Sequence, residues 1–219
     1  FLTSGAVLDG RVGQTSEIDI TGPNIAIVER VGATAQPAGT LQISSATLSA
    51  LNASVLVGGT RSRRDNGVAI STTADRVTVA TSEQAPVELP ELLISARSGI
   101  QVAAGSVLRT TASSGSTAAP GPVLFAEASG ALLHLSNAGQ ATVDRGSFSG
   151  TVGDIDIAAG AKLIAAGSLL LDATRATRSA GELRAGTARG EGGAVSLSAS
   201  RVSLGETAAL VDLSAAGLV

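Results

Sequence analysis

The sequence predicts an all-β chain in which short strands stack in repeated units. An apolar-x-apolar-Ser phrase returns at residues 41–44, 92–95, 133–136 and 195–198. A second phrase, 100–108, returns at 155–163 with the same offsets. Repetition every few tens of residues is typical of proteins whose units bury their apolar faces only by stacking on their neighbours.

The composition indicates the kind of interior that such a stack would have. Hydrophobic residues make up 44% of the 219 residues, yet Trp, Tyr, Met and Cys are absent and Phe occurs only three times. A core of Val, Leu, Ile and Ala suits a narrow interior in which similar layers repeat, because wide interiors are usually filled by aromatic rings. The 27 glycines favour short strands and frequent turns over long helices.

Charge and hydropathy argue against a nucleic-acid partner and against a membrane-spanning helix. The net charge is −3, and the chain has neither a basic stripe nor aromatic platforms, so we expect no nucleic-acid partner. No apolar run approaches the roughly 18 residues of a membrane-spanning helix, so we expect no integral membrane protein. Neither end of the sequence has the features of a terminal cap of a repeat array. We therefore expect residues 1–219 to be a single β-helical segment of a much longer repeat protein.

Short stretches in which apolar and small or polar residues alternate with a period of two predict the strands. We expect strands at 17–20, 25–28, 41–43, 55–57, 68–70, 77–80, 92–94, 100–102, 107–109, 132–135, 141–143, 155–157, 169–172, 195–197, 202–204 and 211–213. Residues 41–57 have some helical spacing, but their β-branched residues favour a strand-turn-strand. Residues 182–189 are a weaker alternative helix.

Three segments are expected to protrude as irregular loops. Residues 61–67 are charged and end in Asn-Gly, residues 82–91 contain two prolines, and residues 110–122 are rich in Ser, Ala and Gly. Long insertions belong on the periphery of a stacked fold, where they interrupt no strand pairing. If one coil takes roughly 20–25 residues, the chain forms roughly nine to eleven rungs.

Residues 92–108, 154–169 and 193–205 carry a family resemblance. Their phrases resemble the repeats of filamentous haemagglutinin-like bacterial exoproteins. The resemblance spans most of the chain and is strongest from residue 92 onward. It implies a right-handed parallel β-helix, also called a β-solenoid. It also implies export by two-partner secretion, with an outer-membrane transporter as partner.

The same resemblance implies the function. Members of the family are large surface or secreted proteins used in adhesion, aggregation and biofilm formation. We therefore expect a structural or adhesive segment outside a Gram-negative bacterium or on its outer surface, with no enzymatic activity and no cofactor. Expected partners are glycans or proteins of a host cell or surface, or other copies of the chain stacked end to end to form a filament.

Two aspartates are candidates for a catalytic site, because parallel β-helices also host polysaccharide lyases and hydrolases. Asp154 and Asp156 lie two apart, so both point to one side of a strand. With Ile155 and Ile157 facing inward, they would face solvent. A solvated polar face is the simpler interpretation. The alternative is a polysaccharide-cleaving site, which would need paired carboxylates and nearby arginines.

Three arginines offer a different surface contact. Arg61, Arg63 and Arg64 could hold an anionic polysaccharide, or they could belong to a solvated turn. A further alternative is a carbohydrate-binding module that uses the loops 61–67 and 110–122. These arginines and the two aspartates are the only surface residues that we single out.

His134 is the only histidine. It lies between Leu133 and Leu135 in an alternating strand, so we expect it to point outward. One histidine without cysteine cannot form a zinc site alone, and no serine stands in a nucleophile elbow. We therefore expect no catalytic, cofactor-binding or metal-binding residue.

Overall fold

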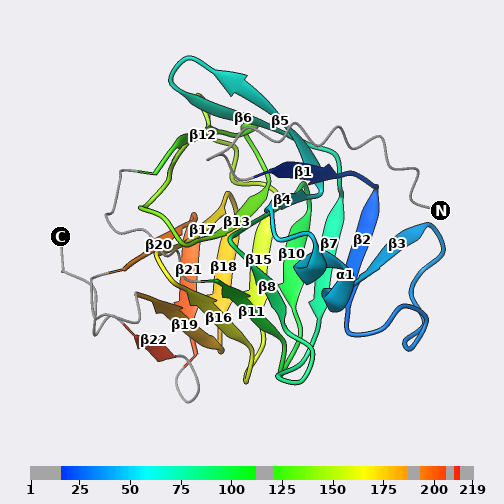
Figure 1. The fold of residues 1–219 in the computed structure, drawn as a ribbon. Coiled ribbons are helices and arrows are strands. Elements are labelled where there is room, and N and C mark those ends of the chain that lie inside the picture. Colours follow the sequence, from blue (N-terminus) through cyan, green and yellow to red (C-terminus); the bar gives the residue numbers. More distant parts are fainter. Residues whose placement is uncertain (1–15, 112–120, 187–192, 206–209, 213–219) are drawn as a thin grey trace.

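The computed structural model describes residues 16–111, 121–186, 193–205 and 210–212. In these residues the chain is mostly β, with one short helix, α1 (Ser45–Ala50) (Figure 1). The all-β class predicted from the sequence is confirmed. The strands form four sheets, which we number I to IV.

Each sheet collects strands from distant parts of the chain. Sheet I has the order β1 (Glu17–Ile20), β4 (Ser54–Val57), β9 (Glu91–Ala96), β13 (Ala131–Ser136), β17 (Ser168–Ala173) and β20 (Ala194–Ser198). Sheet II has the order β21 (Arg201–Leu204), β18 (Ala176–Ser179), β15 (Asp154–Ile157), β10 (Gly99–Val102), β7 (Arg76–Ala80), β2 (Asn24–Val28) and β3 (Thr40–Ser44). Sheet III has the order β22 (Leu210–Asp212), β19 (Glu182–Ala185), β16 (Lys162–Ala165), β11 (Val107–Thr110) and β8 (Val87–Leu89). Sheet IV has the order β14 (Thr142–Asp144), β12 (Val123–Phe125), β6 (Gly67–Thr72) and β5 (Gly59–Arg64).

The chain visits sheets I, II and III in repeated passes. Strands β9, β10 and β11 form one pass, β17, β18 and β19 another, and β20, β21 and β22 the next. In sheets II and III every strand pairs parallel to its neighbours, and the two copies of the repeated phrase align, with Ile100 opposite Ile155 and Leu108 opposite Leu163. Figure 1 shows the result as a succession of colours across sheet II, from β2 to β21.

Sheets I, II and III share one aliphatic core. Alternate side chains of each strand point into it, because successive residues of a strand face opposite sides. Val57 and Ile94 enter from sheet I, Ile100 from sheet II, and Leu108 and Leu163 from sheet III, each 0% exposed. The apolar residues of this core are all Val, Leu, Ile or Ala, and the buried Thr177 and Ser179 stand opposite Ile155 and Ile157.

The central strands of sheet I are buried on both faces, because sheet IV packs on their outer side. Leu56, Leu93 and Leu132 point away from the main core and form a second apolar cluster with Ile70 and Leu124 of sheet IV. Burial on both faces explains why the central strands of sheet I contain consecutive apolar residues, whereas the edge strands β1 and β20 alternate.

The helix α1 is a correction to the strand-turn-strand expected over residues 41–57. Strands β3 and β4 lie at the two ends of that range, but a helical turn joins them. Ser44 caps this helix, since its side chain accepts a hydrogen bond from the Thr47 backbone N–H at 3.1 Å. Leu48 is 0% exposed, and Asn52 follows with a positive φ of 44°, a common ending for a helix.

The expected loops also change. Residues 61–67 lie largely in the antiparallel hairpin of β5 and β6, and residues 82–91 include β8. Of the expected loop 110–122, residues 112–120 lie outside the described residues. Residues 182–185 form β19, so the alternative helix over 182–189 is wrong for that part.

Two further features differ from a uniform stack of nine to eleven parallel rungs. Strand β13 runs antiparallel to both β9 and β17, and sheets I, II and III contain five to seven strands in the described residues. The spacing of about 20–25 residues holds from β15 to β21, where β18 and β21 follow at that interval. Earlier passes are longer because they include sheet IV and the hairpin. No helix in the described part of the chain is long and apolar enough to cross a membrane.

We expect Gly58→Ala to destabilise the protein strongly. Gly58 joins β4 to the hairpin at a φ of +89°, and an added Cβ would lie 2.1 Å from the Ser95 carbonyl oxygen. The backbone there cannot relax without breaking sheet I. The matched control is Gly32→Ala, with a φ of +80° and no heavy atom within 4 Å of the added Cβ.

Both substitutions carry the positive-φ strain, of about 1–2 kcal/mol. In urea unfolding, Gly58→Ala should lower the free energy of unfolding by clearly more than Gly32→Ala. Equal losses would show that the close approach to Ser95 adds nothing.

Candidate functional site

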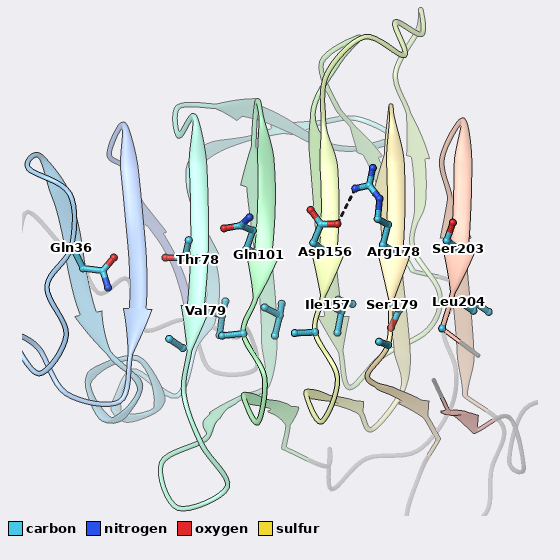
Figure 2. Close-up of a pocket in the computed structure, with 16 residues that line it drawn as sticks. Gln36, Thr78, Val79, Gln101, Asp156, Ile157, Arg178, Ser179, Ser203 and Leu204 are labelled. Carbon is cyan, nitrogen blue, oxygen red and sulfur yellow. Dashed lines mark hydrogen bonds and ion pairs between the residues drawn. The ribbon is translucent and has the colours of Figure 1, made fainter. Parts of the chain in front are cut away.

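A groove crosses the strands on the outer face of sheet II. Its volume is about 610 Å³. Within a mostly apolar lining, five neighbouring strands each contribute one outward-facing polar side chain, in the order Thr78, Gln101, Asp156, Arg178 and Ser203. Figure 2 shows these side chains in one row, with Gln36 from the loop before β3 at the end next to Thr78.

Both predicted aspartates lie on this face. Ile155 and Ile157 point into the core, 0% and 3% exposed, so the alternation of β15 turns Asp154 and Asp156 outward, as expected. The expectation that both face solvent is wrong for Asp154, which is buried at 9% exposure. The side chain of Arg175, which lies in the connection between β17 and β18, covers its carboxylate.

Arginines neutralise both carboxylates. Arg175 contacts Asp154 through two nitrogens, with Nε 2.8 Å from Oδ1, while Arg178 Nη1 lies 2.9 Å from Asp156 Oδ1 and 3.6 Å from Asp154 Oδ2. The hydrogen bond from Arg175 holds the pKa of Asp154 below its ordinary value of 3.8, although burial opposes the shift. Hydrogen bonds to Asp154 and Asp156 likewise raise the pKa values of Arg175 and Arg178. Asp154 therefore stays ionised at neutral pH.

A second, smaller hollow of about 190 Å³ adjoins the groove. Gln101 and Asp156 line both hollows, and the smaller one adds Arg76, Asp154 and Gly99. Gly99 is the direct strand neighbour of both Arg76 and Asp154, so no side chain stands between these two charged residues. The exposed Arg76 makes no hydrogen bond or ion pair with any described residue.

The predicted arginine cluster is used within the molecule. Arg61 is 7% exposed at its side chain, and its Nε lies 2.7 Å from Asp19 Oδ1 of β1. Arg63 pairs with Glu17 at 2.8 Å, and the guanidinium of Arg64 lies 4.9 Å from the centre of the Phe125 ring. The arginines thus fasten the β5–β6 hairpin to sheet I and to β12, and they do not form one free cationic surface.

His134 is buried, contrary to the outward position expected. It does point away from the main core, but sheet IV covers that face and leaves it 1% exposed. Its Nε2 lies 2.7 Å from Glu91 Oε1, and its buried Nδ1 has no hydrogen-bond partner among the described residues.

A polar network continues from this histidine to the edge of sheet I. The second carboxylate oxygen of Glu91 accepts a hydrogen bond from the Ser54 hydroxyl, which in turn accepts one from Arg61 Nη1 at 2.6 Å. Burial raises the pKa of Glu91, but the hydrogen bonds and charges of His134, Ser54 and Arg61 outweigh it, and the net pKa lies below the ordinary 4.5. The network satisfies polar groups that lie between two sheets.

The residues that complete the groove are not evident from the sequence alone. Arg175 and Arg178 lie around β18, which was not among the predicted strands, so nothing placed them next to β15. Thr78 and Gln101 alternate with buried valines and isoleucines, and this pattern could have identified them as outward residues. No group of three or more His, Cys, Asp or Glu residues in the described ranges could hold a metal ion.

Comparison with models of protein families, with curated proteins and with solved structures finds no match to this chain. The chemistry of the site is therefore argued from its own geometry.

The depressed pKa of Glu91 predicts a loss of stability in acid. A carboxyl group whose pKa is lower in the folded state stabilises the protein above its unfolded pKa, and this contribution is lost as the pH falls through the folded value. The free energy of unfolding should therefore drop below about pH 4.5.

Glu91→Gln should lower this free energy at pH 7 by about 1–3 kcal/mol, because one hydrogen-bond acceptor is lost between the sheets. In the same variant, the free energy of unfolding should fall less steeply as the pH is lowered below about 4.5. The control is Glu88→Gln, which removes a half-exposed carboxylate on β8 that lies 3.4 Å from Arg109 Nη1 at the surface. Urea unfolding at pH 7, 5, 4 and 3 gives the comparison. Parallel curves for Glu91→Gln and the unmodified protein would contradict the assignment.

Proposed function

We propose that the chain is a right-handed parallel β-helix that serves as a structural and adhesive segment of a secreted or surface-attached bacterial exoprotein. The observation that carries this proposal is the stacking of successive passes in register around one aliphatic core. Such a fold grows by adding passes, so it suits a long displayed surface.

Two arguments support the coiled, right-handed form. In the described residues sheets II and III are entirely parallel. The strands β9 to β11, β17 to β19 and β20 to β22 each visit sheets I, II and III in that order. Connections between parallel strands of one sheet are almost always right-handed, because right-twisted strands feed the crossover that way. The reversed strand β13 occupies the sheet I position of the pass that continues through β15 and β16, so the reversal affects one strand of sheet I and leaves sheets II and III parallel.

The resemblance of residues 92–108, 154–169 and 193–205 to filamentous haemagglutinin-like repeats supports the extracellular location. A location outside a Gram-negative cell, with export through an outer-membrane transporter, follows from that resemblance. Glycans or proteins of a host cell or surface, and other copies of the chain, are the partners we propose for the exposed faces.

We favour contact over cleavage at the groove. A polysaccharide hydrolase needs a carboxylic acid whose pKa is raised so that it can protonate the leaving group. The pKa of Asp154 moves the opposite way, and both Asp154 and Asp156 are held by arginines. The same groove does supply hydrogen-bonding groups in series, which favours a carbohydrate-binding module as the second candidate. The arginines 61, 63 and 64 fit that role less well, because each has a partner within the molecule.

Surface labelling of the bacterium that produces the chain tests this proposal. Antibodies raised against the purified chain should label intact cells or their extracellular matrix, and Fab fragments should reduce attachment and aggregation. The controls are a cytoplasmic protein, which should be labelled only after permeabilisation, and Fab fragments of unrelated specificity. Labelling of the chain only in permeabilised cells would contradict an extracellular role.

A further inference from the structure

We propose that the groove and the smaller hollow on sheet II form one site for an extended acidic oligosaccharide. Its hydroxyl groups would lie along the polar row, and one carboxylate would pair with Arg76. The inference rests on the proposed function, since it identifies the surface and the ligand class through which an adhesive segment would make contact.

The polar row matches a linear polymer that runs across the strands. Neighbouring strands lie about 4.8 Å apart, so hydrogen-bonding groups recur at that interval from Thr78 to Ser203. Thr78, Gln101 and Ser203 can each donate and accept hydrogen bonds, whereas Asp156 and Arg178 are paired with each other and offer their remaining lone pairs and N–H groups. Hydroxyl groups can serve both kinds of partner, which makes a polyhydroxylated chain the best chemical match.

The charges of the site favour a ligand that carries a carboxylate. Three arginines and two aspartates line the two hollows. Asp154 is paired with Arg175 and Asp156 with Arg178, so the positive charge of Arg76 is left unmatched. An arginine guanidinium binds a carboxylate through two parallel hydrogen bonds, and the side-chain-free position at Gly99 leaves space beside it.

The same charges disfavour other polymers. A nucleic acid places a phosphate at every step and needs several unpaired cations, whereas the lining of the two hollows offers Arg76 alone. A polycation would meet Asp154 and Asp156 only after displacing their arginines. A mostly neutral sugar chain with spaced carboxylates needs neither several unpaired cations nor the displacement of these arginines.

Calorimetric or NMR titration with two matched oligosaccharides tests the site. The acidic probe is a hyaluronan hexasaccharide, in which glucuronate alternates with N-acetylglucosamine, and the neutral probe is chitohexaose. We expect the acidic probe to bind more tightly, with chemical-shift changes around Thr78, Gln101 and Arg76. Absence of binding by both probes overturns the inference, as does equal binding of the neutral probe.

Two variants and one control locate the binding. Arg76→Gln should weaken binding of the acidic probe at least about tenfold and bring it to the level of the neutral probe. Gln101→Leu should weaken both probes, because this side chain lines both hollows. The control is Arg201→Gln, which removes an equal charge from the exposed β21 outside the lining of either hollow. Equal losses for Arg76→Gln and Arg201→Gln overturn the site, because they would indicate attraction by net charge only.

The failure of this inference can be told from a failure of the proposed function. Surface labelling and attachment that persist while both oligosaccharides fail to bind would overturn the groove as the contact site and leave the adhesive role standing. A chain found only inside the cell would overturn the adhesive role whatever its affinity for sugars. Circular dichroism of each variant verifies that lost binding does not come from unfolding.

Discussion

The shared aliphatic core of sheets I, II and III is the constraint on which the rest of the structure depends. Three sheets that face one interior favour small and branched side chains, and neighbouring passes repeat similar residues at many register positions. Ile100 stands opposite Ile155, and Leu108 opposite Leu163, for this reason. The near absence of aromatic residues therefore follows from the geometry of the core.

A second constraint arises where this core meets sheet IV. The central strands of sheet I carry apolar residues on both faces, yet Glu91 and His134 point to the outer face between the two sheets. Polar groups in such a position are stable only when they bind one another, which links Glu91 to His134 and, through Ser54, to Arg61. The arginine that might have served as a surface contact is thereby part of the packing.

Local alternation explains which parts of the fold could be predicted. The strands around Ile100 and Ile155, and the direction of their side chains, follow directly from period-two patterning. Strand direction does not, because a reversed strand such as β13 has the same alternation as a parallel one. Burial of His134 depends on sheet IV, whose hairpin lies where the charged residues 61–67 suggested a loop. Arg175 and Arg178 could not be assigned to the site, because their position beside β15 is a consequence of the stacking register.

The outer face of sheet II differs from that of sheet I in being uncovered by any other described sheet. Its side chains need not match a packing partner, so polar residues such as Gln101 and Ser203 are tolerated there at no cost to the core. Without a packing partner, these outward residues of sheet II could be substituted while the inward residues stay mostly aliphatic. In such a stack, stability is therefore carried by the inward residues of each strand, and the alternate outward residues, Arg76 among them, are left for the contacts proposed above.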